Sequence, residues 1–231
     1  METLPQSVLR RLTKYLSHAQ LMQTRGADWV SSQEIAEALG VTSSTVRQDL
    51  THLDFSGTSK KGYATEGLRA ALGAVLGADV VWSMIVVGAG NLGSALALHE
   101  EFMRRGFSLQ GIFDADPHKI GLKFGAFRVQ PMEELPAVVG KKKIDIGIIA
   151  VPTAVAQRVA DLMIASGIRG LLNLTFSHVV APRRVAVVDA RIVASLQELA
   201  HAIKSRREGR AEAGPPARPP RPLPRGAPGR H

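Results

Sequence analysis

The glycine-rich segment Gly88-Ala89-Gly90-Asn91-Leu92-Gly93 has the spacing G-x-G-x-x-G, which is typical of a loop that binds the pyrophosphate of a dinucleotide. In this motif the first glycine makes a tight turn, and the second lets the phosphates approach the backbone. The third lets the following helix pack against the strand, and the helix N-terminus attracts negative charge. We therefore expect all six residues to belong to a cofactor site.

Asp114 adds a second chemical group to this prediction. It lies 21 residues after Gly93, at the end of the apolar run Leu109–Phe113. A carboxylate about 20 residues beyond the motif accepts a hydrogen bond from a ribose 2′-hydroxyl. Because a carboxylate repels a 2′-phosphate, NAD(H) is favoured over NADP(H) as the ligand.

The elements around the motif are those of a Rossmann-type βαβ unit. The apolar run Val81–Val87 predicts a buried strand before the glycines, and helical sequence begins at Ser94. Two further strands are predicted over Ile144–Val151 and Ile168–Leu174, with a helix over Ala154–Ser166 between them. This alternation predicts a parallel sheet with right-handed crossovers.

Three more residues join the predicted cofactor site because they stand at carboxyl ends of strands, where ligands of open α/β sheets bind. They are Val151, Pro152 and Asn173. The alternative is an empty Rossmann fold whose glycines serve only packing.

The first 78 residues have a different, helical periodicity. Ser31 and Glu34 have the spacing of a capping box, and Gly40 is placed to end the helix that they begin. A third helix is expected through Val46, Leu50 and Leu53, so the segment predicts a helix-turn-helix. The Gly/Ser/Lys-rich stretch 54–63 is expected to form a β-hairpin wing, which makes a winged-helix domain.

The third helix carries side chains suited to DNA. If Val46 and Leu50 point inward, Arg47 and Gln48 point outward, and these two types recognise guanine and adenine edges. Small hydroxyl groups at its start approach phosphates closely, and the wing adds two cations. The predicted DNA-binding residues are Ser43, Ser44, Thr45, Arg47, Gln48, Lys60 and Lys61. A helical protein-interaction module is the alternative.

Composition limits the other classes of function. With 45% hydrophobic and 21% charged residues, the 231-residue chain has the profile of a soluble globular protein. The absence of cysteine excludes disulfides, thiolate zinc sites and a cysteine nucleophile, and no metal site is predicted. No apolar run approaches the roughly 20 residues of a membrane span, and a signal-peptide pattern is lacking, so a cytoplasmic protein without membrane contact is expected.

The domain boundaries follow from composition and charge. We expect a winged-helix domain at 1–78, a Rossmann NAD(H)-binding domain at 79–190, a C-terminal helix at 191–205 and a disordered Pro/Arg-rich tail at 206–231. The tail holds seven arginines and two glutamates, more than half of the net charge of +9. Overall basicity is therefore no argument for DNA binding by the folded part.

Three functions remain open on these residues. A dehydrogenase needs a substrate domain, for which no segment remains, so a non-enzymatic regulator that uses the nucleotide as a signal is favoured. The alternatives are a small NAD(P)-dependent oxidoreductase with an accessory N-terminal module, and a nucleotide- or CoA-binding scaffold.

Over roughly residues 5–204 the combination resembles the Rex family of redox-sensing transcriptional repressors. Val46-Arg47-Gln48-Asp49-Leu50 resembles the V-R-K-D-L of its recognition helix, and Gly62-Tyr63 matches the end of its wing. The nucleotide loop Val87–Gly93 and the segments Phe113–Pro117, Val151-Pro152, Ala156-Gln157 and Gly170–Asn173 follow in the family's order.

The resemblance implies a homodimer in which the C-terminal helix crosses to pack between the two domains of its partner. It also implies binding to palindromic operator DNA when NADH is low, and release when NADH, a regulatory ligand, binds.

The resemblance further implies a redox-switch network of an N-terminal Arg, an Asp before the last helix and a Tyr on the nucleotide-loop helix. Arg11 and Asp189 match the first two, and His99 stands in the Tyr position. One hypothesis is that His99 takes the switching role and makes sensing pH-dependent. The competing view is that it only fills space.

Overall fold

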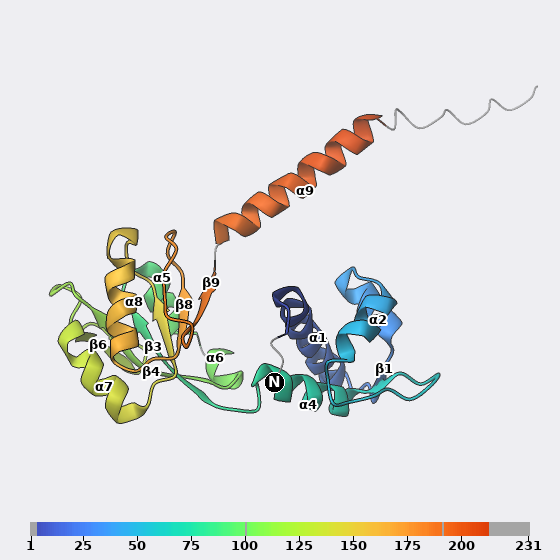
Figure 1. Ribbon diagram of the computed structural model, residues 1–231, viewed down its shortest axis with the longest axis horizontal. Helices are drawn as coiled ribbons and strands as arrows, with labels where there is room; N and C mark the ends of the chain where they lie inside the picture. The colour runs from blue at the N-terminus through green and yellow to red at the C-terminus, as the bar shows by residue number, and fades with distance from the viewer. Residues whose placement is uncertain (1–3, 100, 191, 213–231) are drawn as a thin grey trace, which may run out of the picture. The chain divides into compact units, whose positions relative to one another are not determined.

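The computed structural model describes residues 4–99, 101–190 and 192–212, with side chains as far as residue 206 (Figure 1). Contacts divide the chain into two compact units, Met1–Asp189 and Ala190–His231. Within the first unit the buried apolar side chains form separate clusters, one from residues 8–72 and two from residues 84–185. The domain boundary at residue 78 falls between these clusters and stays a prediction.

The N-terminal part consists of four helices and a small two-stranded sheet. Its elements are α1 (Gln6–Thr24), β1 (Trp29–Val30), α2 (Ser32–Leu39), α3 (Ser43–Leu50), β2 (Tyr63–Ala64) and α4 (Thr65–Leu76). Strands β1 and β2 pair antiparallel. Leu12 and Tyr15 of α1, Val46 of α3, and Leu68 and Leu72 of α4 are almost fully buried in one core.

The helix-turn-helix forms because local signals start and stop its helices. Ser31 accepts the Glu34 N–H, and Glu34 accepts the Ser31 N–H, which is the predicted capping box. Gly40 ends α2 with a φ of 67°, in the left-handed region that favours glycine. The hydroxyl of Thr42 accepts the Thr45 N–H and so caps α3. Helix α3 stops at Leu50, three residues earlier than expected, and Leu53 is buried in the turn that follows.

The wing is smaller than the predicted hairpin. A single bridge joins Thr58 and Gly62, and no ladder extends beyond it in the described chain. The strand that follows, β2, pairs with β1, a partner that the sequence analysis did not anticipate.

The second part is a seven-stranded sheet of order β5-β6-β4-β3-β7-β8-β9. The strands are β3 (Trp82–Val87), β4 (Phe107–Asp114), β5 (Lys123–Phe124), β6 (Phe127–Pro131), β7 (Ile146–Ile149), β8 (Gly170–Asn173) and β9 (Ala186–Asp189). All pair in parallel except the edge strand β5, so the predicted α/β Rossmann-type fold class is confirmed.

Helices cover both faces of this sheet (Figure 1). They are α5 (Asn91–Ala97), α6 (Glu101–Arg104), α7 (Leu135–Lys142) and α8 (Ala156–Ala165), with short 3-10 turns at Met132–Glu134 and Thr153–Val155. Buried residues of α7 and α8 pack with Ile85, Val87 and Phe113 on one face. Residues of α5 and α6 pack with Met84 and Val86 on the other. The single helix expected from Ser94 onward is therefore two short ones.

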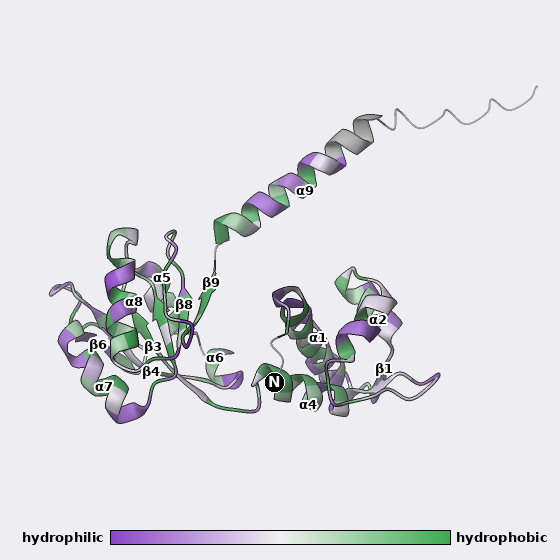
Figure 2. Cartoon of the chain, viewed as in Figure 1, coloured by the Kyte–Doolittle hydropathy of each residue, from purple (hydrophilic) through white to green (hydrophobic). Residues whose placement is uncertain are grey.

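Helix α9 (Ile192–Glu212) is the one regular element in the described part of the second unit. Figure 2 shows hydrophobic and hydrophilic residues mixed along it. The helix continues through residues 206–212, which were expected to be part of the disordered tail, so that boundary is wrong. The segment is rich in Arg, Glu and Ala, which favour helix, and the first proline comes only at Pro215. The rest of the predicted tail, 213–231, lies outside the described residues.

No helix in the described part of the chain has the length and apolar character needed to cross a membrane.

The close packing of α5 against the sheet predicts that replacing Gly93 costs more stability than replacing Gly90. A Cβ at Gly93 would press into the carbonyl of Gly88, whereas a Cβ at Gly90 would meet nothing within 4 Å. We expect Gly93→Ala to lower the free energy of unfolding by about 1–3 kcal/mol. Gly90→Ala, the matched control, should leave it unchanged or slightly raised. Urea denaturation followed by circular dichroism measures both, and equal losses would contradict this packing.

Candidate functional site

A cavity of about 890 Å³ lies at the carboxyl ends of β3, β4 and β7. The sequence-predicted cofactor residues that line it are Gly88, Gly90, Asn91, Leu92, Asp114, Val151 and Pro152. This edge of the sheet is where ligands of open α/β folds bind. The structure therefore brings together most of the predicted site from three separate strand ends.

The three motif glycines differ in what surrounds them. Gly88 has a φ of 105°, and a Cβ there would collide with the carbonyl of Ala150 on the neighbouring strand end. Gly93 lies against the backbone of Gly88, so it lets α5 approach the strand. Gly90 faces open space and the cavity. The turn, the packing and the open approach are thus divided among the glycines as the motif predicts.

Asp114 is tied into the glycine turn. Its Oδ2 accepts the Ala89 N–H at 2.7 Å and the Lys119 ammonium at 3.1 Å, and its Oδ1 accepts the Asp116 N–H at 2.9 Å. Burial opposes ionisation, but the hydrogen bonds from Asp116, Ala89 and Lys119 outweigh it and lower the pKa of Asp114. The carboxylate is therefore charged at neutral pH and held in one orientation. Ala89 serves the site through this backbone bond.

Asn173 is fully buried and does not line the cavity. Its Nδ2 donates to the Ser177 carbonyl and to Asp189 Oδ1, both at 2.7 Å. Its Oδ1 accepts the N–H and the hydroxyl of Thr175. These bonds fix the chain after β8, so in this structure Asn173 organises the loop that follows this strand. Its contact with a cofactor stays a prediction.

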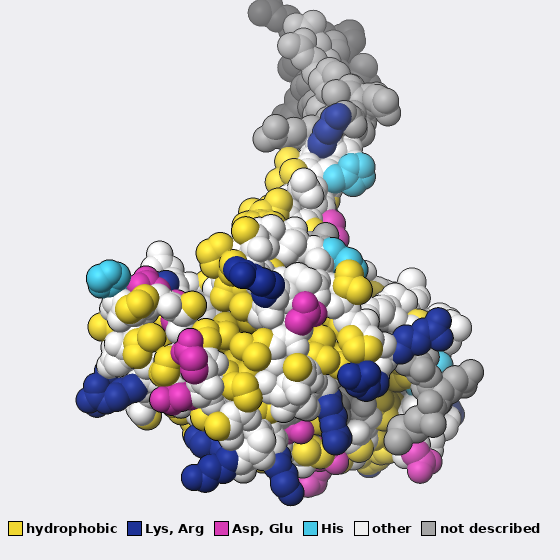
Figure 3. All heavy atoms as spheres, turned by 60° about the vertical axis from the view of Figure 1, so that its left-hand side comes forward, with side chains coloured by type: hydrophobic (Ala, Val, Ile, Leu, Met, Phe, Trp, Pro, Cys, Tyr) yellow, Lys and Arg dark blue, Asp and Glu magenta, His cyan; other side chains and the backbone are white. Residues whose placement is uncertain are grey.

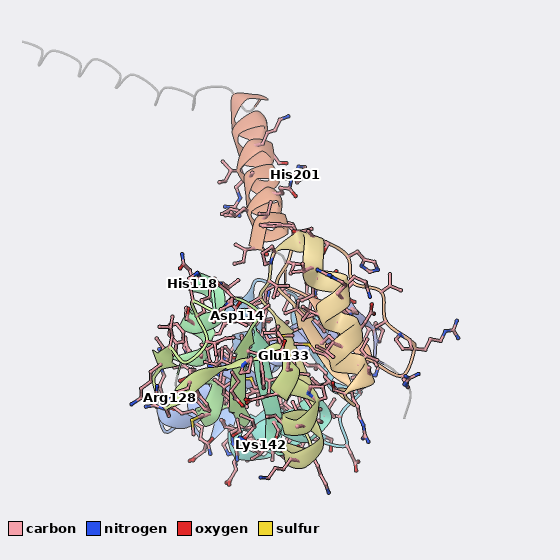
Figure 4. The ribbon with its side chains drawn as sticks, turned by 90° about the vertical axis from the view of Figure 1, so that its left-hand side faces the viewer. Asp114, His118, Arg128, Glu133, Lys142 and His201 are labelled. Atoms are coloured by element: carbon pink, nitrogen blue, oxygen red, sulfur yellow. The ribbon has the colours of Figure 1, made fainter. Side chains whose placement is uncertain are left out.

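Two cationic cavity residues were missed by the sequence analysis. Lys119 pairs with Asp114, and Arg158 reaches the cavity from the first turns of α8. Arg158 comes directly after Ala156-Gln157, a pair that resembles the family, but neither charge belongs to the glycine motif. Figure 4 shows Asp114 within the sheet domain and His118, the neighbour of Lys119, farther out.

The predicted DNA-reading surface is exposed on α3. Arg47 and Gln48 are exposed, while Val46 and Leu50 are buried, as the helical periodicity predicted. Ser44 is exposed, and Ser43 and Thr45 are half-buried at the helix start. The Arg47 guanidinium donates to the Ser32 hydroxyl at 3.2 Å, which holds it on the α2 side of the helix.

The wing lies close to this helix. A hollow of about 430 Å³ is lined by Arg47 and by wing residues that include Lys60 and Lys61. The Lys61 ammonium lies 4.0 Å from the centre of the Trp29 ring, a cation–π contact that anchors the wing base. Lys60 has a φ of 62° and is exposed at the tip. Arg47 and both lysines therefore share one surface.

In this chain Arg11 is paired with Asp49, and its place in the predicted switch network stays a prediction. Its guanidinium donates to both carboxylate oxygens of Asp49, at 2.6 and 2.8 Å, and the Tyr15 hydroxyl donates to Asp49 Oδ2 at 2.7 Å. Arg11 is thereby engaged in holding α3 against α1. Asp49 is only 2% exposed, and a buried carboxylate stays ionised only where charged or hydroxyl groups donate to it. This explains the pairing of Arg11 with Asp49.

The pKa values in this cluster are shifted together. Burial alone would raise the pKa of Asp49, but hydrogen bonds from Arg11 and Tyr15 outweigh burial and lower it. Burial and the bond to Asp49 raise the pKa of Tyr15, and the bond to Asp49 raises that of Arg11. The cluster thus consists of an anion, a cation and a neutral phenol at ordinary pH.

The other two predicted switch residues lie in the sheet domain. Asp189, at the end of β9, accepts from Asn173, and its Oδ2 is 3.8 Å from His178 Nδ1. His99 is exposed between α5 and α6, with its ring tilted against Phe102. Within the described chain the three residues are not brought together. A switching role for Arg11, His99 and Asp189 stays a prediction.

Among the described residues, no group of three or more His, Asp or Glu side chains is arranged to hold a metal ion.

Comparison with protein families covers both parts of the chain. Residues 79–176 match the family described as CoA binding domain, and residues 3–51 match the family described as putative DNA-binding protein N-terminus. The first match covers the glycine motif and Asp114, and the second covers α1, α2 and α3.

Curated relatives match over nearly the whole chain. The redox-sensing transcriptional repressor Rex of Caldicellulosiruptor saccharolyticus is 36% identical over 207 residues, which is 90% of this chain and 94% of the relative. That of Carboxydothermus hydrogenoformans is 38% identical over 201 residues, 87% of this chain and 97% of the relative. That of Desulforamulus reducens is 39% identical over 196 residues, 85% and 93%.

Solved structures of RSP, a Rex-family repressor, match equally broadly. One matches with a TM-score of 0.83 and 31% identity, covering 93% of this chain and 100% of RSP. RSP in complex with NADH matches with a TM-score of 0.83 and 32% identity, covering 91% of this chain and 99% of RSP. RSP in complex with NAD⁺ and operator DNA matches with a TM-score of 0.84 and 32% identity, covering 94% of this chain and 100% of RSP.

The Arg11–Asp49 pair predicts an acid-sensitive part of the stability. Because the pKa of Asp49 is lowered on folding, its stabilisation is present above the unfolded value of about 3.9 and is lost as the pH falls through the lower folded value. Asp49→Asn should therefore lower the free energy of unfolding by about 2 kcal/mol at pH 7, and by less at pH 3.

Urea unfolding at fixed protein concentration measures this difference. Tyr15→Phe is the matched control, since it removes one hydrogen bond to Asp49 and should cost about 1 kcal/mol. A cost of Asp49→Asn that is the same at pH 3 as at pH 7 would show that the ion pair does not contribute.

Proposed function

The chain belongs to the Rex family of redox-sensing transcriptional repressors, and from that membership we propose that it represses transcription in response to the NADH/NAD⁺ ratio. It binds operator DNA when NADH is low and releases the DNA when NADH occupies the cavity at Gly90 and Asp114. The observation that carries this proposal is the match to RSP, which has been solved both with NADH and with NAD⁺ and operator DNA. NAD(H) acts as a regulatory ligand, without catalysis.

The cavity supports the binding of a dinucleotide. Gly90 leaves the backbone open to a pyrophosphate, and Asn91 and Leu92 at the start of α5 line the same cavity. The N-terminus of a helix attracts phosphate groups. Asp114 is ionised and oriented for a ribose hydroxyl. These are the groups that a dinucleotide requires, and they come from the ends of adjacent strands.

The surface of α3 and the wing supports DNA binding. Arg47 and Gln48 are exposed on a capped helix, and Lys60 and Lys61 lie on the neighbouring wing. The division of labour follows from chemistry, because α3 carries the types that recognise base edges and the wing carries simple cations.

Apolar surfaces support a homodimer. Along α9, Ile192, Leu196, Leu199 and Ile203 recur at i, i+4, i+7 and i+11 and are 45–67% exposed. Independently, the sheet carries an apolar hollow of about 410 Å³ lined by residues such as Phe102, Ile148 and Val188. Figure 3 shows exposed apolar side chains in yellow over much of the face that it presents. We propose that a second copy covers such surfaces and that α9 crosses to its partner.

Signalling between the two ligands is a matter of linkage. NADH weakens DNA binding only by the factor by which DNA weakens NADH binding, typically about 1–3 kcal/mol of coupling. In a dimer, closure moves two recognition helices that must meet half-sites about 34–36 Å apart. A change of dimer geometry is therefore sufficient to release the operator.

Fluorescence anisotropy of a palindromic duplex, selected for binding from a random palindrome library, tests the function. NADH should weaken binding by about 5–150-fold, and NAD⁺ should not. Gly90→Val should bind DNA normally but lose the response, because its side chain fills the approach to the pyrophosphate. Turnover of NADH with a small carbonyl compound, together with no binding to DNA, would instead favour the oxidoreductase.

The same assay separates the roles of the DNA-binding residues. Arg47→Ala should remove the preference for the selected duplex over a scrambled one, at a cost of about 1–3 kcal/mol. Lys60→Ala should weaken binding to both duplexes alike. It should also reduce the salt dependence of the affinity by an amount that corresponds to about one released counterion. Lys14→Ala, which removes a charge from α1, is the control and should change neither. Equal effects of the Arg47 and Lys60 variants on both duplexes at every salt concentration would contradict this division.

A further inference from the structure

The carboxylate of Asp114 has little capacity left for a ligand. A carboxylate offers about four lone-pair sites. Two on Oδ2 are taken by the Ala89 N–H and by Lys119, and one on Oδ1 is taken by the Asp116 N–H. By this count one site remains. The edge of a ribose presents two neighbouring hydroxyl groups, so Asp114 alone does not satisfy both.

Lys119 has donors to spare at the same place. An ammonium group carries three N–H donors, and Asp114 uses one of them at 3.1 Å. The other carboxylate near it, Asp116 Oδ2, is 3.9 Å away, beyond hydrogen-bond distance. The Lys119 side chain is 36% exposed and lines the cavity. It can therefore donate to a ligand oxygen without leaving Asp114.

Lys119 also changes the charge that a ligand meets. Asp114 and Asp116 place two carboxylates on this side of the cavity, and Lys119 is the cation in contact with both. The second cation among the described lining residues, Arg158, comes from α8 and has no ion pair among the described residues. A 2′-phosphate on the ribose would meet Asp114 together with the charge of Lys119, instead of an uncompensated carboxylate.

We propose that Lys119 is a second ribose-recognition residue, which donates to one hydroxyl oxygen while Asp114 accepts from the other, and that its charge sets how strongly a 2′-phosphorylated dinucleotide is rejected. The proposal rests on the proposed function, since it assumes that NAD(H) binds with its adenosine ribose at Asp114. Discrimination between NADH and NADPH is then a property of the Asp114–Lys119 pair. If Lys119 only anchored Asp114, its loss would weaken both dinucleotides equally.

Calorimetric titration of the full chain with NADH and with NADPH tests this, the latter by competition where binding is weak. Lys119→Ala should weaken the binding of NADH several-fold and that of NADPH by about tenfold more, because NADPH loses a charge-assisted bond and meets an unbalanced carboxylate. The ratio of the NADPH to the NADH dissociation constant should therefore rise. Lys119→Arg keeps the charge and should keep the ratio of the two dissociation constants near that of the unmodified chain.

Two further variants complete the design. Lys142→Ala removes a lysine from the end of α7, where Lys142 donates to the Gln110 carbonyl, far from Asp114 (Figure 4). It should leave both dissociation constants unchanged. Asp114→Ala should lower the ratio of the NADPH to the NADH dissociation constant, since it removes the repulsion of the 2′-phosphate.

The outcomes are distinguishable. A ratio that is unchanged or lower in Lys119→Ala overturns the role of Lys119, even though NADH binds. A ratio that is unchanged in Asp114→Ala overturns the placement of the ribose. If the unmodified chain binds neither dinucleotide, the proposed function itself is wrong.

Discussion

The hydrogen bond from the Ala89 N–H to the Asp114 carboxylate joins the glycine turn after β3 to the end of β4. It exists because Gly88 adopts a left-handed conformation and lies against the Ala150 carbonyl, a place that no side chain could occupy. The turn, the carboxylate and the start of α5 are consequently fixed relative to one another before any ligand arrives. A site prepared in this way spends less binding free energy on ordering itself, which leaves more for discriminating between ligands.

Helix α3 is held by a comparable constraint in the N-terminal part. Asp49 faces inward from α3 and is bonded by Arg11 and Tyr15, two residues one helical turn apart on α1. The pair Arg47-Gln48 precedes Asp49 directly, so fixing one face of α3 also fixes the face that is exposed. A buried ion pair adds little net stability against an apolar packing, but breaking it is costly, which makes it a good device for setting orientation.

Neither site accounts for regulation by itself. The nucleotide cavity and the α3–wing surface are built on separate hydrophobic clusters, and the described lining of each comes from one part of the chain. Coupling between them requires an element with two arrangements that both ligands bias. The exposed apolar stripe of α9 and the apolar hollow on the sheet are the surfaces on which an assembly of two chains would provide such an element.

The sequence by itself determined the features that depend on neighbours along the chain. The capping box at Ser31, the glycine spacing at Gly88–Gly93 and the exposure of Arg47 are consequences of helix and turn geometry over a few residues. The Rossmann-type fold also followed, because alternating strands and helices leave few ways to connect a parallel sheet. Only the tertiary structure decided that Arg11 pairs with Asp49, that Asn173 is buried without lining the cavity, and that Lys119 forms an ion pair with Asp114. These pairings depend on how elements pack across the fold and on which charge lacks a partner there, and no local spacing encodes either.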